Sequence, residues 1–537
     1  MGVADVVEEI LAACRSMAGL PYDGEPVDQL QHALQTAALA RDENADDELL
    51  VAALLHDIAR APAVAGIMRD APDHHHGELG SAWLTPRVGP EVAWLAEQHV
   101  AAKRYLVAVD HEYRAALSPT SLETLADQGG AMDAAEVAEV ERCPAWSRAV
   151  RLRRWDDLAK DPDKVVPGLD AYRAPLGALV ARTAGIARAV VFDGPGRPLR
   201  SIEVPVPTPG PGEVVVRVVA TTICGSDLSS FAGRRAVPTP SVLGHESIGI
   251  VEAAGEGVTD LDGRAPAVGE RVTWTITTRC GACPTCRAGV PQKCADVRKY
   301  GHERLGDVPG PYGGLAERVL LPRGTDIIAL PPEVPDEVAC PASCATATIA
   351  GVIRVAGVTP GDTVVVTGLG MLGLTACAMA SVAGATVVGI DVDPRRVALA
   401  KRFGASRAVA LDDVSTALGP DSADVLLELS GAPATTALGI EFLRVGGRAA
   451  LAGAVHPGPP VPLDAERVVR RLLRIEGLHN YTPQDLRSAV AFLQAHGTAF
   501  PFAALIGSEH PLHDAEAAFA AATVTGAPRV MLRPTAA

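Results

Sequence analysis

The first third of the chain has apolar residues at helical spacing. They recur every three or four positions over 6–17, 30–40, 48–58, 79–83 and 92–106, and proline and glycine separate these segments. No alternating strand pattern appears among them. The pattern predicts a helical domain over residues 1–183.

The pattern changes twice after residue 183. Runs rich in Val and Ile, bounded by Pro-Gly turns, follow at 187–192, 213–220 and 248–253, which is typical of a β-rich unit. From about residue 345, predicted strands at 363–367 and 386–391 alternate with predicted helices at 369–383 and 394–403. That alternation predicts a doubly wound parallel sheet. We expect a β-rich domain at 187–343, an α/β domain at 344–490, and a return to the β-rich domain at 491–537.

Composition and charge exclude several classes of partner. The chain has 537 residues with 48 Lys+Arg and 64 Asp+Glu, a formal net charge of −16, which disfavours binding to nucleic acid or to anionic membranes. The 48% of apolar and 21% of charged residues are ordinary for a globular protein. No stretch offers about 20 apolar residues without Gly or charge. We expect a cytoplasmic protein that acts on small molecules.

A glycine-rich turn follows the first predicted strand of the α/β domain. Gly368, Gly370 and Gly373 form the pattern G-x-G-x-x-G between an apolar strand and an apolar helix. Asp391 ends the next strand, where a carboxylate can accept hydrogen bonds from both ribose hydroxyls and repels a 2′-phosphate. The sequence therefore predicts a dinucleotide site that favours NAD over NADP.

Cysteine and histidine spacing predicts two metal sites in the β-rich domain. The first has the spacing C-x2-C-x2-C-x7-C, which wraps a tetrahedral structural zinc without an open position, and consists of Cys280, Cys283, Cys286 and Cys294. The second is spread along the chain as Cys224, His245 and Cys344. Two thiolates and one imidazole leave a fourth position open for water or an alcohol, as a catalytic zinc requires.

These motifs, in this order, make residues 187–537 resemble the zinc-dependent medium-chain alcohol dehydrogenases. The resemblance rests on the segments 222–227, 244–246, 280–294 and 340–344. It implies a GroES-like β domain with a Rossmann domain, and a homodimer or homotetramer formed through the dehydrogenase. It also implies NAD-dependent oxidation of an alcohol, in which zinc lowers the pKa of the alcohol and hydride passes to the nicotinamide.

The same resemblance assigns roles to single residues. Cys224, His245 and Cys344 ligate the catalytic zinc, with Glu246 nearby. Ser226 hydrogen-bonds the substrate hydroxyl and Asp227 supports His245, whereas Ser229 stands where many members carry a relay histidine. In the cofactor site, Arg396 is expected at the adenosine ribose and Arg529 at the pyrophosphate.

The helical region holds a second set of metal-ligand residue types. The set consists of His32, His56, Asp57, a histidine at position 75 or 76, His99, and a late carboxylate at Asp156 or Asp157. Four imidazoles and two carboxylates at these intervals are the inventory of a dinuclear metal site, since an aspartate carboxylate can bridge two metals. We favour His76, which directly precedes a turn, and Asp157.

This order of histidines and aspartates resembles the HD-domain superfamily, whose members are mostly metal-dependent phosphohydrolases. Further residues resemble one branch of it, the mixed-valent diiron oxygenases that cleave the carbon–phosphorus bond of 1-hydroxyalkylphosphonates; these are Tyr22, Glu25, Lys103, Ser121 and Thr124, with the segment 117–130. Arg60 departs from that branch, which often has histidine there.

The branch resemblance implies the following site. His32, His56, Asp57 and Asp157 hold one iron, and Asp57, His76 and His99 hold the other. Lys103, Ser121 and Thr124 hold the phosphonate, while Tyr22 and Glu25 form a gate near the substrate's amino group. The implied reaction uses O₂ to convert a substrate such as 2-amino-1-hydroxyethylphosphonate into glycine and phosphate.

The sequence thus predicts a bifunctional enzyme of phosphonate catabolism with two zincs, two irons and NAD. Two alternatives keep the dehydrogenase and change the helical domain. It is either an HD phosphohydrolase that uses Mn²⁺ or Mg²⁺, or a non-catalytic sensor or oligomerisation module.

Overall fold

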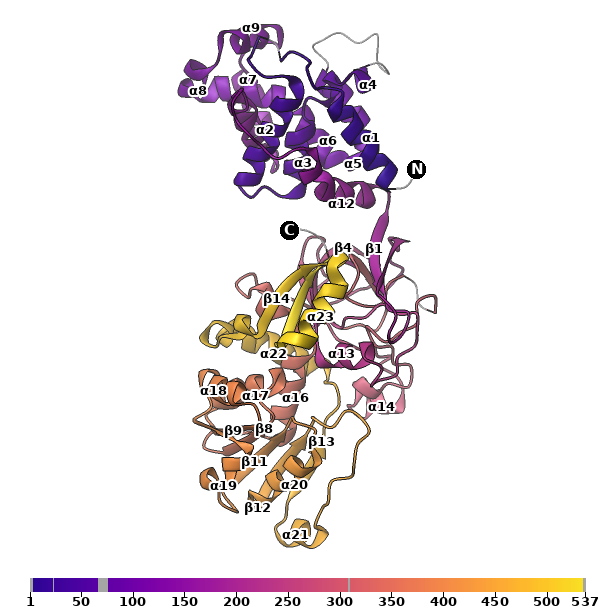
Figure 1. Cartoon of the computed structure of the whole chain (residues 1–537), viewed down its shortest axis with the longest axis vertical. Helices are drawn as coiled ribbons and strands as arrows, with labels where there is room; N and C mark the ends of the chain where they lie inside the picture. The colour runs from indigo at the N-terminus through magenta and orange to yellow at the C-terminus, as the bar shows by residue number, and fades with distance from the viewer. Residues whose placement is uncertain (1–2, 23, 66–75, 308–309, 535–537) are drawn as a thin grey trace. The chain divides into compact units, whose positions relative to one another are not determined.

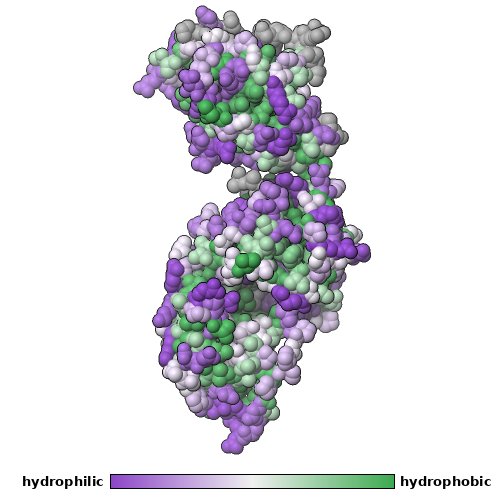
Figure 2. All heavy atoms as spheres, viewed as in Figure 1, coloured by the Kyte–Doolittle hydropathy of each residue, from purple (hydrophilic) through white to green (hydrophobic). Residues whose placement is uncertain are grey.

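A computed structural model describes residues 3–22, 24–65, 76–307 and 310–534. They form two compact units, one up to Ile186 and one from Ala187 onward (Figure 1). In the space-filling view, hydrophilic and hydrophobic residues are interspersed over the face shown of each unit (Figure 2).

The first unit is helical throughout its described residues. Helix α11 packs on α2, α3, α6 and α7, and its Leu152 and Trp155 belong to the fully buried core of the unit. The helices, including short 3-10 turns (η), are α1 Val3–Arg15, α2 Gln29–Asp42, α3 Asp47–Leu55, η1 Ile58–Arg60, α4 Pro62–Ala65, α5 His76–Val88, α6 Pro90–Glu97, α7 His99–Val109, α8 His111–Ala116, α9 Pro119–Asp127, α10 Ala134–Val140, α11 Trp146–Leu158, η3 Leu169–Tyr172 and α12 Arg173–Thr183.

Two of the helices differ from the helices that the apolar pattern predicts. The predicted helix 48–58 ends at Leu55, so that His56 caps it and Asp57 leaves the helical conformation with φ −105 and ψ 19. The predicted helix 92–106 breaks at Gln98 into α6 and α7, and His99 becomes the first residue of α7. Both breaks place predicted metal-ligand side chains at helix ends. The apolar periodicity of the sequence does not indicate where such breaks occur.

The second unit contains a β-rich domain built on one seven-stranded sheet. The strand order is β14-β15-β3-β4-β5-β7, with β6 paired to β3, and β1 pairs with β2 in a separate two-stranded sheet. The last two strands thus return to the sheet that begins 300 residues earlier in the chain. The strands are β1 Ile186–Val191, β2 Arg200–Pro205, β3 Val214–Ile223, β4 Glu246–Ala254, β5 Arg271–Trp274, β6 Arg318–Leu321, β7 Ile327–Ala329, β14 Ile506–Pro511 and β15 Arg529–Arg533.

The helices of the β-rich domain are short. They are α13 Gly225–Phe231, α14 Pro284–Arg287, η4 Pro291–Lys293, α15 Asp336–Ala339, η5 Cys340–Ser343, η9 Phe502–Leu505, η10 Leu512–Asp514 and α23 Ala515–Thr525.

The α/β domain is a six-stranded parallel sheet in the order β10-β9-β8-β11-β12-β13, the doubly wound order of a Rossmann fold. The strands are β8 Thr363–Thr367, β9 Thr386–Asp391, β10 Arg407–Ala410, β11 Ala423–Glu428, β12 Leu443–Leu451 and β13 Arg474–Gly477. The helices are α16 Ala345–Ala356, α17 Met371–Val382, α18 Pro394–Ala400, η6 Lys401–Phe403, η7 Leu411–Asp413, α19 Val414–Ala417, α20 Pro433–Glu441, α21 Ala465–Arg470, α22 Pro483–His496 and η8 Gly497–Ala499.

Both faces of this sheet are covered by apolar side chains. Val364 and Val366 of the central strand β8 belong to one buried cluster, whereas Val365 between them belongs to another. Successive strand residues point to opposite faces, so the two clusters are the two layers that sandwich the sheet. The domain thereby has the doubly wound architecture that its sequence pattern predicts.

Among the described residues, no single helix is long and apolar enough to cross a membrane. Asp336–Ser343 and Ala345–Ala356 meet the length and composition criteria only as a pair bent by 57°.

Candidate functional sites

Three buried histidines of the helical unit have the same hydrogen-bonding state. Each places Nδ1 within hydrogen-bond distance of a backbone carbonyl: His32 at 2.9 Å from Ala159, His56 at 2.9 Å from Ala53, and His99 at 2.6 Å from Ala96. Since a carbonyl only accepts, Nδ1 must carry the proton when the ring is neutral, and Nε2 then presents a lone pair. This is the form in which histidine binds metals.

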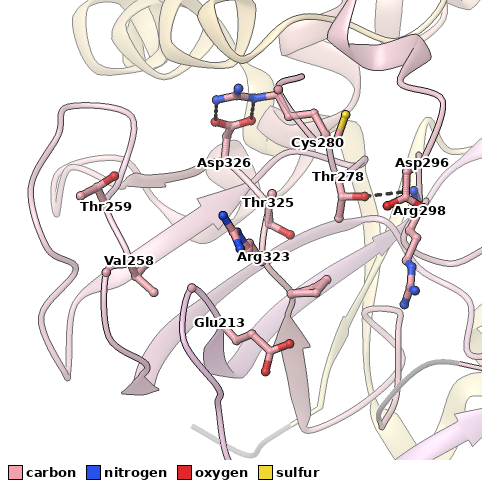
Figure 3. Close-up of a pocket in the computed structure, with 16 residues that line it drawn as sticks. Glu213, Val258, Thr259, Thr278, Cys280, Asp296, Arg298, Arg323, Thr325 and Asp326 are labelled. Carbon is pink, nitrogen blue, oxygen red and sulfur yellow. Dashed lines mark hydrogen bonds and ion pairs between the residues drawn. The ribbon is translucent and has the colours of Figure 1, made fainter. Parts of the chain in front are cut away.

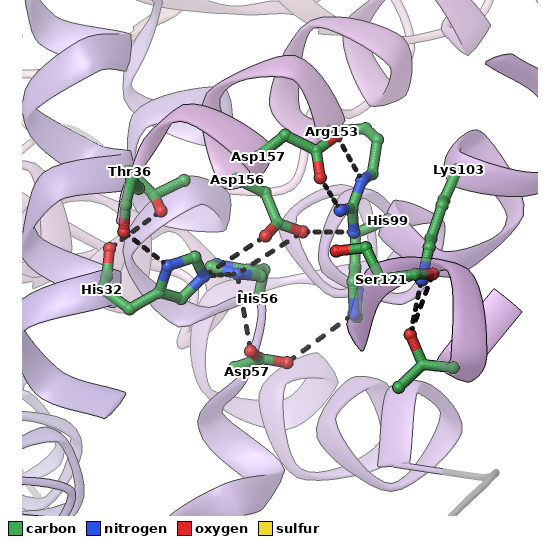
Figure 4. Close-up of polar contacts among 12 residues, drawn as sticks. His32, Thr36, His56, Asp57, His99, Lys103, Ser121, Arg153, Asp156 and Asp157 are labelled. Atoms are coloured by element: carbon green, nitrogen blue, oxygen red, sulfur yellow. Dashed lines mark hydrogen bonds and ion pairs between the residues drawn. The ribbon is translucent and has the colours of Figure 1, made fainter. Parts of the chain in front are cut away.

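The side chains of His32 and His56 meet, whereas that of His99 lies on the other side of Asp57 (Figure 4). Nε2 of His32 lies 3.1 Å from Nε2 of His56, and two neutral acceptors at that distance repel each other unless a proton or a metal cation lies between them. The carboxylate of Asp156 completes the cluster, with oxygens 3.3 Å from Nε2 of His32 and 3.9 Å from Nε2 of His56. Two imidazoles and a carboxylate in a buried pocket suit a divalent transition metal.

Asp57 has the position of a bridge between this cluster and a second one. Its Oδ2 lies 3.7 Å from Nε2 of His56, and its Oδ1 lies 3.6 Å from Nε2 of His99. Each oxygen therefore faces a different imidazole, as in a carboxylate that joins two metals. The remaining predicted ligand, His76, begins α5, but its side chain lies outside the described residues, as do His74 and His75.

The preference for Asp157 over Asp156 as a metal ligand is wrong. Asp157 turns away from the histidines and binds Arg153 through both oxygens and Tyr113 through one. Burial by itself would raise the pKa of Asp156, but the charges of Arg153 and the two histidines outweigh it and hold that pKa well below its usual range. The two aspartates are adjacent on α11 and point about 100° apart, so sequence order alone does not separate them.

The residues predicted to bind the phosphonate line a small cavity beside the histidines. It has a volume of about 70 Å³, and Tyr22, Glu25, Lys103, Ser121 and Thr124 all line it. Nζ of Lys103 donates to Oγ1 of Thr124 at 2.7 Å. The ring of Tyr22 stacks on His32 with centroids 4.0 Å apart, and its hydroxyl donates to Asp156 at 3.3 Å.

One cation in this cavity was missed by the sequence analysis. Nζ of Lys160 donates to Glu25 at 2.9 Å and to Oγ of Ser121 at 3.3 Å, and thereby ties the predicted gate to the predicted phosphonate contacts. No spacing rule connects residue 160 with residue 25, so only the folded chain reveals the pair.

The spread ligand set of the second unit is brought together by strand pairing. Cys224 follows β3 and His245 precedes β4, and these strands pair with Thr222 opposite Glu246. Sγ of Cys224 therefore lies 3.2 Å from Nε2 of His245, and Cys344, at the junction of η5 and α16, joins them. Two sulfurs and one imidazole nitrogen in a buried pocket match the donor set that zinc prefers.

Ser226 and Asp227 lie where their predicted roles require. Oγ of Ser226 is 2.9 Å from Sγ of Cys224 and 3.3 Å from Nε2 of His245, so it borders the metal position. Asp227 caps α13 by accepting from the backbone N–H of Cys224, and its other oxygen lies 3.3 Å from Nδ1 of His245. The helix cap and the orientation of the imidazole are thus supplied by one carboxylate.

Glu246 and Arg529 form a fully buried pair at the metal site. The guanidinium donates to both carboxylate oxygens at 2.6 Å, and Thr222 donates to the same carboxylate. Arg529 also lines a cavity of about 390 Å³ that reaches from Cys224, His245 and Cys344 to Gly370 and Gly373. The expected pyrophosphate contact of Arg529 stays a prediction, and the structure adds an ion pair with Glu246 that the sequence analysis did not expect.

The glycine turn has the geometry that a dinucleotide needs. Gly368 has φ +87, and a Cβ on Gly373 would lie 1.8 Å from the Gly368 carbonyl oxygen, so neither position accepts another residue. A Cβ on Gly370 would meet no atom within 4 Å, which leaves the backbone open to a phosphate. Asp391 and Arg396 line an adjoining cavity of about 310 Å³ at the switch point of the sheet.

The four clustered cysteines form the second sulfur site, with ligand atoms within 4.8 Å of one another. Backbone N–H groups point at their sulfurs, as that of Cys283 does toward Cys280 at 3.3 Å, which stabilises thiolates. None of the ten cysteines, all in the described part of the chain, forms a disulfide. A larger cavity of about 650 Å³ lies beside this lobe, and among the predicted site residues only Cys280 lines it (Figure 3).

A second histidine near the catalytic metal position was also missed. The ring of His302 lies 5.8 Å from that of His245, and its Nδ1 hydrogen-bonds the Tyr300 carbonyl. Burial, followed by the charges of Lys299 and His245, lowers the pKa of His302 to about 2, so the ring is neutral.

Comparison with known proteins agrees with this geometry. Residues 210–332 match the alcohol dehydrogenase GroES-like domain, residues 372–495 match the zinc-binding dehydrogenase domain, and residues 30–125 match the HD domain. An L-threonine 3-dehydrogenase from Deinococcus radiodurans is 33% identical over 307 residues, covering 54% of this chain and 82% of that protein. The chain belongs to the zinc-dependent medium-chain alcohol dehydrogenase family. It carries an HD domain fused before the dehydrogenase.

One further relative and two solved structures are also similar to the dehydrogenase part of this chain. A sorbitol dehydrogenase from Halalkalibacterium halodurans is 32% identical over 303 residues, covering 54% of this chain and 83% of that protein. An alcohol dehydrogenase from Thermotoga maritima superposes with a TM-score of 0.61 at 27% identity, covering 65% of this chain and 99% of that one. The structure of a zinc-binding dehydrogenase from Sinorhizobium meliloti bound to NADP superposes with a TM-score of 0.58 at 28% identity. It covers 65% of this chain and 99% of that one.

The corrected ligand assignment predicts different outcomes for two neighbouring variants. Asp156→Asn removes a carboxylate that faces His32 and His56, so we expect loss of the metal bound beyond the two zincs. Asp157→Asn removes only a partner of Arg153 and Tyr113, so metal content stays near that of the wild type, while stability falls by about 1–3 kcal/mol. Metal analysis by mass spectrometry, with zinc as the internal reference, and thermal unfolding measure both.

The reverse pattern, with metal lost in Asp157→Asn and kept in Asp156→Asn, would contradict the assignment.

Proposed function

We propose that this fusion dehydrogenase is a bifunctional enzyme of phosphonate catabolism. Its HD domain would be a diiron oxygenase that cleaves the carbon–phosphorus bond of a 1-hydroxyalkylphosphonate. The observation that carries this proposal is the position of Asp57 between two imidazoles whose lone pairs face it, next to a cavity with a lysine and two hydroxyls. Iron at this site would activate O₂.

The chain's own residues suit a phosphonate. Lys103, Ser121 and Thr124 offer one cation and two hydroxyl donors to its oxygens, and Lys160 adds a second cation paired with Glu25. Tyr22 packs over His32 and lines the same cavity as Glu25. The overall reaction, 2-amino-1-hydroxyethylphosphonate with O₂ to glycine and phosphate, balances without a further reductant.

In the second unit, Ser226 and Asp227 serve the oxidation of an alcohol. Zinc held by Cys224, His245 and Cys344 would lower the pKa of the alcohol. Ser226 would hold the substrate hydroxyl and receive its proton, while Asp227 fixes the imidazole of His245. The nicotinamide would occupy the cavity that these residues share with the glycine turn. We place the enzyme in the cytoplasm as a homo-oligomer.

The oxygenase is tested with the full chain loaded with iron and zinc. On adding 2-amino-1-hydroxyethylphosphonate, we expect release of phosphate and glycine with consumption of one O₂ per phosphate. Asp57→Asn is expected to abolish this reaction, because both imidazole clusters lose their common carboxylate. Cys224→Ser, which affects only the dehydrogenase, serves as the matched control and keeps phosphate release.

The outcomes separate the alternatives. Phosphate release from phosphate esters without O₂ would show an HD phosphohydrolase instead. Binding of only the two zincs, with no reaction, would show a non-catalytic helical domain.

The charge of Lys103 predicts a pH limit for this reaction. Burial, followed by the charge of Arg153, lowers the pKa of Lys103 to about 8. The ammonium binds the phosphonate only while protonated, so kcat/KM falls about tenfold per pH unit above pH 8. Lys103→Arg retains the charge and should remove this limb of the kcat/KM profile. An unchanged limb in that variant would assign the titration to another group.

Asp391 predicts the coenzyme preference. Its carboxylate accepts a hydrogen bond from the N–H of Leu369 at 2.6 Å and lines the cavity of about 310 Å³ beside the glycine turn. A carboxylate in that position disfavours a 2′-phosphate. We expect a lower KM for NAD than for NADP, and Asp391→Ser should reduce that preference at least about tenfold, since Arg396 then faces the phosphate. Asp412→Asn, an exposed position that does not line this cavity, is the control.

If the wild type prefers NADP, the interpretation of Asp391 is wrong.

A further inference from the structure

Two cations of the dehydrogenase cavity have no partner for their charge among the described residues. Arg235 and Lys299 both border the space that contains Cys224, Ser226 and Cys344. Neither the guanidinium nor the ammonium forms a hydrogen bond or ion pair with any residue that the structure describes, although both side chains are half-buried. In contrast, Arg529 in the same cavity is neutralised by Glu246.

Both cations line the same cavity as the predicted ligands Cys224, His245 and Cys344. Burial and then the charge of Arg235 lower the pKa of Lys299, whereas the charges of Cys344, Cys224 and Asp227 act in the opposite direction. Arg235 lies four residues after α13, the helix whose first turn carries Ser226.

One residue of the α/β domain, His479, is also exposed to the positive charge of Arg235 and Lys299. His479 lines the cavity, and burial followed by the charges of Lys293, Lys299 and Arg235 lowers its pKa to about 4. No aspartate or glutamate lines this cavity among the described residues. Half-buried cations without counterions are costly, and an anionic ligand would relieve that cost.

We infer that Arg235 and Lys299 bind an oxyanion carried by the alcohol substrate, so that the dehydrogenase oxidises a hydroxyalkylphosphonate or a hydroxycarboxylate. This inference rests on the proposed dehydrogenase function and specifies its substrate class. The alcohol carbon gives a hydride to the nicotinamide and the hydroxyl gives up its proton, while the oxyanion stays unchanged. A phosphonate here would give the two fused enzymes related substrates.

Three substrates that differ in one group test the inference. 1-Hydroxyethylphosphonate, lactate and propane-1,2-diol share a CH₃–CHOH group and carry a phosphonate, a carboxylate and a neutral hydroxymethyl group, respectively. With the zinc-loaded full chain and NAD, we expect kcat/KM for at least one anion to exceed that for the diol about tenfold or more. The anion with the higher kcat/KM shows whether the site prefers a phosphonate or a carboxylate.

Variants assign this preference to the two cations. Arg235→Gln and Lys299→Gln should each lower the anion-to-diol ratio of kcat/KM about 10- to 100-fold, mainly through KM, because each removes one charge-assisted hydrogen bond. KM for NAD should remain unchanged. Arg234→Gln, an exposed neighbour that does not line the cavity, is the matched control.

A binding measurement covers the case in which none of the three alcohols is oxidised. Methylphosphonate and acetate should change the fluorescence of bound NADH, with weaker binding in Arg235→Gln but not in Arg234→Gln. This signal reports only the dehydrogenase site and ignores phosphonate bound in the HD domain.

Three results would overturn the inference: a diol preferred over both anions, variants that raise KM for NAD instead, or NADH that binds without responding to either anion. A chain that binds no NADH would instead refute the dehydrogenase function itself.

Discussion

Three clusters of electron-pair donors have the composition of cation sites, and within each cluster the donor atoms lie a few ångströms apart. In the helical unit, the Nε2 atoms of His32 and His56 face each other at 3.1 Å, and a backbone carbonyl lies beside Nδ1 of each ring. In the dehydrogenase, two sulfurs and an imidazole crowd together, and four sulfurs do so in the cysteine lobe. A metal ion turns each repulsive cluster into a crosslink between elements distant in the chain.

Local structure is adapted to these clusters. The helices of the first unit end or break at His56 and His99, where each ring bonds a carbonyl three residues earlier. In the second unit, the pairing of β3 with β4 aligns Cys224 with His245, and Asp227 both caps α13 and faces the imidazole. The site residues therefore lie at the ends of helices and strands, where the backbone is free to aim them.

Charge distribution explains how an acidic chain can act on anions. The net charge of −16 opposes an anionic substrate at long range, but screening confines that effect to the surface. Inside the cavities, nearby cations determine the electrostatic potential that an anion meets. Lys103 and Lys160 would serve this role in the helical unit, and Arg235 and Lys299 in the dehydrogenase, where Glu246 neutralises Arg529 but no described carboxylate neutralises the other two.

The sequence by itself determined the fold class, since apolar periodicity and the order of motifs depend only on neighbours along the chain. It also predicted which residues lie together at short spacing, such as the cysteine lobe, and residues that family motifs mark, such as Cys224 and His245; the structure brings the members of each set together. Tertiary structure alone decided between Asp156 and Asp157, because adjacent helix positions point in different directions. It also paired Lys160 with Glu25 in one cavity and placed Arg235 and Lys299 on the wall of another. Those pairs join segments far apart in the chain, and only packing brings them within reach.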